Sequence, residues 1–381
     1  MNSKAIKQRI DSIDALRGLV IILMLLDHAR ERFFYNQPVA DPMVLESTEP
    51  GLFWSRFAAH FCAPVFVFLT GLSAWLYQQK HEGSVKLTRE FLWKRGLFLV
   101  LLEITVINFS WFGAYETLYL QVIWAIGLCM IALGACVGLP GRTLFALGLL
   151  IVAGHNALDF ITLNPGEWGY TLWTVLHDRG FILKTEALSI KASYPLLPWI
   201  GVILLGYAAG PLYSKSFNPK RRARWLLSLA TTCFISFLLL RGFNIYGETQ
   251  VWTEQGNLAA NIRAIFNVTK YPPSLNFVQI TFAGMFVMLY LMERFQGHWT
   301  TILTSFGGAP MFFYIVHLYV LLVLYKLALF VFGTPGPGYL SLPNIYWIWL
   351  MTAALAALLY KPTQWFNQHK RSSTQAWIKY L

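Results

Sequence analysis

Arg17 and His28 lie in one largely apolar run of the chain, residues 13–34. Charged groups at membrane depth are costly and usually face a protein interior or a wet cavity. The separation of eleven positions amounts to about 20° past three helical turns, so both side chains project from one face, about 16 Å apart along the axis. Asp14, one turn before Arg17, shares that face. A spanning helix that presents a cation and an imidazole to one cavity predicts chemistry or transport.

His28 is the residue of this run that best fits proton transfer near neutral pH, because a free imidazole has a pKa near 7. We expect it to act as a general base or as an acyl relay. Asp27 projects about 100° away from it, so Asp27 either orients the ring or pairs with Arg30 one turn later. The competing interpretation is a hydrogen bond that only packs two helices. Function is favoured because Arg17 and His28 share a face.

A second polar cluster opens the next apolar run, residues 56–77. Arg56 and His60 are one turn apart, and Pro64 frees backbone carbonyls to line a site. If the first two runs form a hairpin, His60 lies at the depth of His28 and becomes a second catalytic candidate. The alternative is a histidine that is satisfied within a helix interface.

Further polar residues near the later apolar runs are candidates for binding a substrate. Asp159 follows His155 by four positions and shares its helix face. Lys270 precedes two prolines that open a helix, where it is placed to meet an anion or a substrate carboxylate. His317 lies deep in its run, where helix packing is the default role. The substrate-binding candidates are Asp14, Trp54, Arg56, His155, Asn156, Asp159, Lys270 and His317.

The composition is that of a polytopic membrane protein. Of the 381 residues, 56% are hydrophobic and 13% are charged, against about a quarter charged in a soluble domain. The net charge of +12 does not indicate nucleic-acid binding. Lys and Arg concentrate in short connections between apolar runs, as the positive-inside bias produces.

Ten apolar runs are long enough to cross a hydrocarbon core of about 30 Å as helices. More basic and less basic connections alternate through all ten, which predicts that both termini are cytoplasmic. We expect an all-α bundle of about ten transmembrane helices, forming a single domain over residues 1–381, with residues 1–12 and 362–381 as cytoplasmic ends. The runs lie near residues 13–34, 56–77, 91–112, 118–138, 142–161, 194–214, 223–243, 273–293, 306–332 and 343–361.

Several chemistries lack support in the sequence. No phosphate-binding loop, dinucleotide fingerprint, zinc-protease motif or nucleophile elbow is present. The histidines are scattered without ligand-like spacing, so no metal site is expected. The four cysteines lie inside apolar runs and are interpreted as small core residues.

Five segments carry a resemblance to known membrane proteins. Residues 11–24 resemble the opening of bacterial membrane proteins related to heparan-alpha-glucosaminide N-acetyltransferase. The likeness continues through residues 63–71, 121–127, 194–201 and 269–274. The spacing of Arg17 and His28 is also similar to the signature of the acyltransferase-3 membrane family. The chain departs from the animal lysosomal enzyme in having no histidine before Trp54.

This resemblance implies an integral-membrane acyltransferase of the bacterial inner membrane. It implies that acetyl-CoA is used from the cytosol, with no metal, and that the acetyl group passes to a sugar or amino sugar on the far side. We expect membrane lipid as a partner, no nucleic acid, and leave a homodimer open. The catalytic candidates are His28, Arg17, Asp27 and His60, and the candidates for binding the CoA phosphates are Arg17, Arg95, Arg221 and Arg222.

Two other function classes stay open at this point. The first is a proton-coupled secondary transporter of a small organic anion or sugar, with His28, Arg17 and Asp27 as the coupled site. An acyltransferase consumes acetyl-CoA in detergent, whereas a transporter needs sealed vesicles and a gradient. The second is a structural or assembly subunit, which predicts no loss of function when the buried charges are removed.

Overall fold

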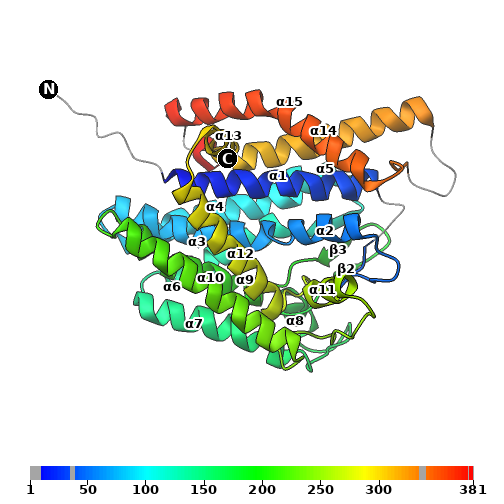
Figure 1. Cartoon of the computed structure of the whole chain (residues 1–381). Helices are drawn as coiled ribbons and strands as arrows, with labels where there is room; N and C mark the ends of the chain where they lie inside the picture. Colours follow the sequence, from blue (N-terminus) through cyan, green and yellow to red (C-terminus); the bar gives the residue numbers. More distant parts are fainter. Residues whose placement is uncertain (1–9, 35–38, 334–339, 376, 381) are drawn as a thin grey trace.

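The computed structural model describes residues 10–34, 39–333, 340–375 and 377–380. In this part of the chain the fold is mostly helical, with long helices packed side by side and a small sheet with short helices at one end of the bundle (Figure 1). The α-helices are α1 (Asp11–Phe33), α2 (Pro50–Ala59), α3 (Cys62–Lys80), α4 (Val85–Leu102), α5 (Asn108–Phe112), α6 (Val122–Cys136), α7 (Gly141–Gly154), α8 (Tyr170–Leu176), α9 (Leu196–Ala208), α10 (Pro219–Gly242), α11 (Leu258–Phe266), α12 (Leu275–Arg294), α13 (His298–Gly307), α14 (Pro310–Phe332) and α15 (Ile345–Ser372).

Shorter elements join these helices. A π-helical turn, η1 (Glu103–Ile107), follows α4, and 3-10 turns form η2 (His155–Leu158), η3 (Gly210–Tyr213) and η4 (Trp377–Tyr380). Three strands, β1 (Thr117–Leu120), β2 (Gly180–Lys184) and β3 (Ser189–Ala192), form one sheet of order β1-β3-β2. Strand β3 is parallel to β1 and antiparallel to β2. The prediction of an all-α fold missed this sheet.

Each predicted apolar run contains a helix in the structure. Among the described residues, six helices are long and apolar enough to cross a membrane, and α6 and α9 are shorter apolar helices. The chain is therefore a helical membrane protein, while the number of ten crossings and the side of each terminus stay predictions. Residues 1–9 of the predicted cytoplasmic N-terminus lie outside the described residues.

Several predicted helix boundaries are wrong. The run 306–332 is divided, because α13 ends at Gly307 and α14 begins at Pro310, whose ring and missing N–H favour the first position of a helix. The helix of the run 343–361 does not end at residue 361, because α15 continues as far as Ser372 with Pro362 inside it.

Helix α1 lies inside the bundle and packs against α13, α14, α15, α12, α2 and α3. The crossing of α1 with α13 is close enough to require glycine on both helices. A Cβ added at Gly18 would collide with the carbonyl of Leu303, and one added at Gly307 would collide with the carbonyl of Asp14. Small residues allow such a close backbone approach between membrane helices.

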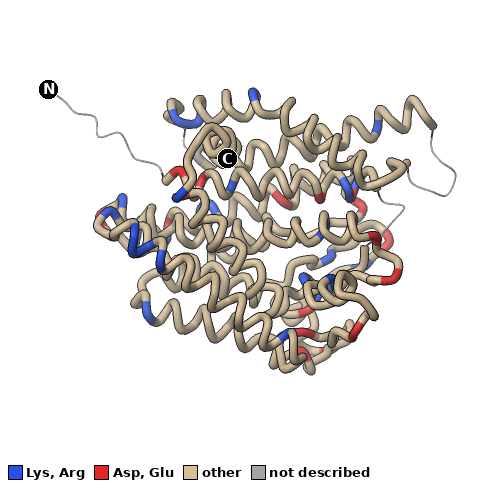
Figure 2. The backbone as a smooth tube through the Cα atoms, in the orientation of Figure 1, with Lys and Arg blue, Asp and Glu red and all other residues tan. Residues whose placement is uncertain are grey.

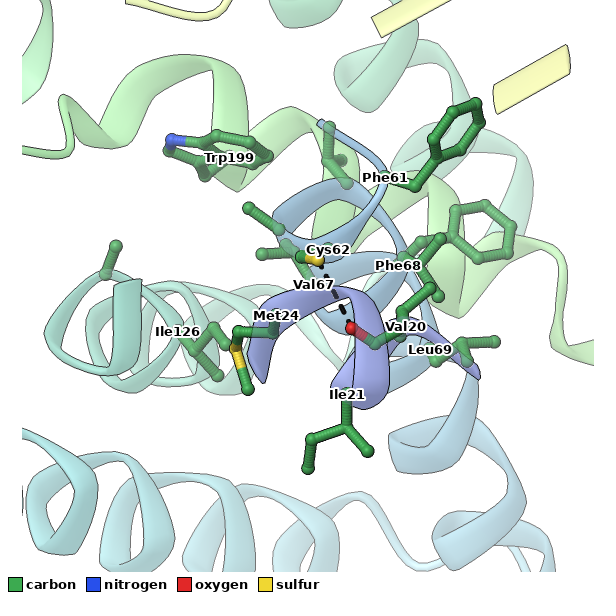
Figure 3. Close-up of a cluster of buried hydrophobic side chains, with 14 of the residues drawn as sticks. Val20, Ile21, Met24, Phe61, Cys62, Val67, Phe68, Leu69, Ile126 and Trp199 are labelled. Carbon is green, nitrogen blue, oxygen red and sulfur yellow. Dashed lines mark hydrogen bonds between the residues drawn. The ribbon is translucent and has the colours of Figure 1, made fainter. Parts of the chain in front are cut away.

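The apolar core beside α1 fixes the depth of its functional side chains. Figure 3 shows Val20, Ile21 and Met24 of α1 packed among side chains of α3, with Ile126 and Trp199 nearby. Within this cluster the thiol of Cys62 donates to the carbonyl of Val20 over 3.2 Å. This contact ties the start of α3 to the middle of α1, so the two helices hold a common cavity wall.

Charge is distributed unevenly between the two ends of the bundle. In Figure 2 the lysine and arginine positions along the backbone gather at the end where α3 joins α4 and α9 joins α10. We call this the basic end. The opposite end carries the sheet, α8 and α11, and we call it the sheet end (Figure 1). Acidic residues are more frequent there (Figure 2).

Candidate functional site

Three cavities follow one another inside the bundle, from the basic end to the sheet end. The basic-end cavity has a volume of about 310 Å³, the central cavity about 60 Å³ and the sheet-end cavity about 600 Å³. The first two share Met24, Phe66 and Val122 as lining residues. The last two share Glu31, Gln121, Tyr194 and Tyr271. The central cavity is therefore the smallest of the three and lies between the other two.

The basic-end cavity combines apolar walls with three cations. Arg17 of α1, Arg95 of α4 and Lys370 of α15 line it, together with Gly307 and Gly308 at the break before α14. Arg17 is held in place by Asp14 at 2.9 Å and by the hydroxyl of Ser73. A guanidinium group can donate two parallel hydrogen bonds to phosphate oxygens. The apolar walls are suited to contact with a thin organic chain. Of the four arginines predicted to bind the CoA phosphates, Arg17 and Arg95 line this cavity.

His28 lines the central cavity and makes its main polar contact with His317 of α14. Its Nδ1 lies 2.8 Å from Nε2 of His317, whose own Nδ1 lies 2.8 Å from the carbonyl of Phe313. A carbonyl only accepts, so Nδ1 of His317 carries the proton. With both rings neutral, His28 then donates from Nδ1 and keeps the lone pair on Nε2. In this arrangement the contact between the two histidines leaves the Nε2 lone pair of His28 available to accept a hydrogen bond or a proton.

Aromatic rings enclose this histidine pair. Trp111 and Tyr314 meet the ring of His28 edge-on, with centroids 5.1 and 5.7 Å away. His28 is 8% exposed and His317 is fully buried. The enclosure limits the orientations that the imidazole of His28 can adopt.

The carboxylate of Asp27 accepts its hydrogen bonds from two arginines. Its Oδ1 accepts from Arg30 at 2.8 and 3.0 Å, and its Oδ2 accepts from Arg56 at 2.7 Å. Of the two roles expected for Asp27, the structure shows the pairing with Arg30. All three side chains are buried. Because each charge has a partner, this cluster fixes α1 against α2 next to the central cavity.

Lysines and arginines outnumber carboxylates around the sheet-end cavity. Arg30, Arg32, Arg56, Arg179 and Lys326 line it, and Glu31 and Asp41 are its acidic residues. The hydroxyl of Tyr271 donates to that of Tyr194 over 3.0 Å at the boundary with the central cavity. The guanidinium of Arg179 lies over the ring of Tyr271, 4.8 Å from its centroid. This vestibule therefore presents a positive potential to an incoming molecule.

Lys270 reaches the central cavity from a loop that is held on several sides. Its backbone N–H donates to Asp41, and the neighbouring Thr269 donates to Glu248 through both N–H and hydroxyl. His155 donates from Nε2 to the carbonyl of Pro273 over 2.8 Å. Burial raises the pKa of Glu248, although hydrogen bonds from Ser274 and Thr269 oppose that shift. The chain thus fixes this loop firmly, and Lys270 with it.

His155, Asn156 and Asp159 lie together at the end of the apolar run 142–161, and their network includes His177 of the loop that follows α8. His177 contacts Asp178 at 2.9 Å, Asp159 at 3.3 Å and the carbonyl of His155 at 3.1 Å. Burial alone would lower the pKa of His177, but its bonds to Asp159 and Asp178 outweigh burial and raise the pKa to about 9. The network braces the Lys270 loop and lines none of the three cavities. His177 was missed in the sequence.

Four other candidates lie apart from the three cavities. His60 is buried against Phe57 and Phe277. Trp54 is 39% exposed and packs on aromatic neighbours. Arg222 pairs with Glu293 at 2.9 Å, and Arg221 lies over the ring of Phe217. The sequence could not give their depth relative to His28, because that depends on how each helix is packed.

The comparison with known families agrees with this geometry. Residues 9–242 match the family model of heparan-alpha-glucosaminide N-acetyltransferase, catalytic. The chain belongs to this family. The matched region supplies Arg17, His28 and Arg95, whereas Lys270, His317 and Lys370 lie beyond it. No curated protein matches the chain in a direct sequence search.

Proposed function

We propose that this protein is a transmembrane acyltransferase that moves an acetyl group from cytosolic acetyl-CoA to a sugar or amino sugar at the other side of the bacterial inner membrane. The carrying observation is that His28, held by His317, lines the small cavity that lies between two larger ones. Family membership supports the transfer of an acetyl group. The basic end is then the cytosolic end, as the positive-inside bias predicts.

The donor is proposed to enter through the basic-end cavity. Arg17, Arg95 and Lys370 meet the phosphates of the CoA at its mouth. The pantetheine arm is a thin chain of roughly 15–20 Å, comparable with the rise of about 16 Å from Arg17 to His28 along α1. The thioester therefore reaches the central cavity while the nucleotide stays at the membrane surface.

The acceptor is proposed to enter through the sheet-end cavity, past Tyr194 and Tyr271. Its hydroxyl or amine attacks the thioester carbonyl while Nε2 of His28 takes the proton. His317 keeps His28 in the tautomer that can do so. Holding both reactants in one small cavity supplies much of the rate advantage. The surplus of arginine and lysine in the vestibule suits an acceptor that carries an anionic group.

The test is acetyl transfer by the purified protein in detergent, with labelled acetyl-CoA and a panel of sugars and amino sugars. We expect label in an acceptor, and a loss of about 10²–10⁴-fold in kcat for His28→Ala. Normal size-exclusion behaviour and Tm of that variant show that it is folded. Full activity of folded His28→Ala, or no release of CoA by the unaltered protein with any acceptor, contradicts the proposal.

A further inference from the structure

We infer that Lys270 is a further catalytic residue, whose ammonium group, assisted by the side-chain amide of Gln121, holds the oxygen of the thioester carbonyl as negative charge develops on it. This inference rests on the proposed function. His28 accounts for removal of the proton from the acceptor, and Lys270 would account for stabilisation of the oxyanion. A base alone leaves the developing negative charge on the carbonyl oxygen without a partner.

Lys270 is a charged side chain buried without a protein acceptor. It is 3% exposed and lines the same cavity as His28. Within the described residues, no acceptor forms a hydrogen bond or a close ion pair with its Nζ, which lies 5.1 Å from the centroid of the Tyr271 ring and is attracted to the charges of Asp27 and Glu31. A buried lysine almost always has a partner. The missing partner is therefore expected to be a substrate oxygen.

The carboxylates nearest to Lys270 in this cavity are already paired. Asp27 bonds to Arg30 and Arg56, and Glu31 lies 3.3 Å from Arg30. Neither requires the ammonium group for neutralisation. A role as a simple counter-ion therefore does not explain why Lys270 is directed into the central cavity.

Gln121 is the second donor that faces this space. It precedes α6 and lines both the central and the sheet-end cavities, and its side-chain amide has no recorded partner among the described residues. The N-terminus of α6 behind it is capped by the carboxylate of Glu103, which accepts from the N–H groups of Ile123 and Trp124. This cap holds the start of α6 in place, and Gln121 with it.

The proposed step balances as follows. The acceptor nitrogen or oxygen forms a bond to the thioester carbon, its proton moves to Nε2 of His28, and the π pair of the carbonyl moves to the oxygen held by Lys270 and Gln121. When the carbonyl reforms, the carbon–sulfur bond breaks. The thiolate of CoA then takes the proton from His28. Free CoA and the acetylated acceptor result, and no other reactant is consumed.

Lys270→Met is the direct test, because it keeps the length and apolar stem of the side chain. We expect kcat to fall about 10²–10³-fold, while the Kd for S-acetonyl-CoA, an unreactive ketone analogue of the donor, stays within threefold. Lys270→Arg should recover part of the loss. Lys184→Met is the matched control, because Lys184 is an exposed lysine at the same end and lines none of the three cavities. We expect its kcat to be unchanged.

A second measurement separates catalysis from structural support. A fluoroacetyl thioester has a more electron-poor carbonyl and needs less help from a cation, so the deficit of Lys270→Met should shrink by at least tenfold with that donor. If Lys270→Met does not fold, Gln121→Leu replaces it in this test. We expect Gln121→Leu to lose less kcat than Lys270→Met, and to lose less with the fluoroacetyl donor than with the acetyl donor.

Three results would overturn the inference. They are a kcat for Lys270→Met within threefold of the unaltered protein, an equal deficit for acetyl and fluoroacetyl donors, and a change confined to the KM of the acceptor. In each of these cases the unaltered protein still transfers acetyl groups, so the proposed function survives. If the unaltered protein releases no CoA, the proposed function fails instead.

Discussion

Removal of the imidazole of His317 should reduce the rate without removing the catalytic base. In His317→Leu, the Nδ1–H of His28 loses the acceptor that lies 2.8 Å away in a buried site. An unsatisfied buried donor costs about 1–3 kcal/mol. The tautomer with the proton on Nδ1 loses that amount relative to the tautomer with the proton on Nε2. Because only the first leaves Nε2 free, kcat should fall about 5- to 150-fold.

The assay is initial-rate acetyl transfer with saturating donor and acceptor, together with the Kd for S-acetonyl-CoA. His317→Gln is the matched variant, because an amide oxygen can accept from His28 in place of the imidazole. It should retain more activity than His317→Leu. The double variant His28→Ala/His317→Leu should be no slower than His28→Ala alone, because the second change acts only through the first residue.

Two outcomes would refute this reasoning. One is a folded His317→Leu protein whose kcat lies within threefold of the unaltered value. The other is an additive double variant, which would mean that His317 acts on the reaction independently of His28.

Three further predictions concern the donor site, the close helix crossing and the outer network. Arg95→Gln should raise the KM for acetyl-CoA about tenfold, a loss of about 1.4 kcal/mol, with a smaller effect on kcat; an unchanged KM would remove Arg95 from the donor site. Gly307→Ala should lower the free energy of unfolding by about 1–3 kcal/mol, which is measured as a lower Tm. Gly141→Ala is the control and should leave the Tm unchanged, because the added Cβ meets nothing within 4 Å. Equal Tm values for the two variants would contradict the close crossing of α1 and α13. The pKa of His177 is raised to about 9 from an ordinary 6.5, so its contribution to stability is complete below about pH 6.5 and is lost as the pH rises through 9. The Tm should therefore fall over that interval, and it should fall less in His177→Ala. An identical pH profile of Tm for the two proteins would contradict this prediction.

The helices of this fold could be predicted from the sequence because the features that indicate a helix lie close together in the chain. An apolar run, its length and its flanking charges are read within about twenty residues, and each predicted run contains a helix. The division between α13 and α14 was missed, although Gly307, Gly308 and Pro310 are the residues that permit it. The sheet was missed because its strands are short, and β1 pairs with a strand far along the chain.

The sequence predicted the site residues that carry charge inside an apolar run. It did not predict contacts that depend on which helices pack together. Arg17 and His28 stood out because charge at membrane depth needs a reason. The partner of His28 could not be chosen, since His317 lies 289 positions away and the register between α1 and α14 is set by packing. Lys370 was missed because residues 362–381 were taken for a tail. His60 was the second catalytic candidate in the sequence, but it lines none of the three cavities.

The most direct test of the central claim is a structure of the protein with bound S-acetonyl-CoA. The account predicts that the nucleotide phosphates lie beside Arg17 and Arg95 and that the pantetheine arm follows the apolar walls of the basic-end cavity. It predicts that the ketone carbon lies in the central cavity, about 3–3.5 Å from the position of an acceptor atom that is hydrogen-bonded to Nε2 of His28. A donor bound with its ketone outside the central cavity, or an arm that enters from the sheet end, would contradict it.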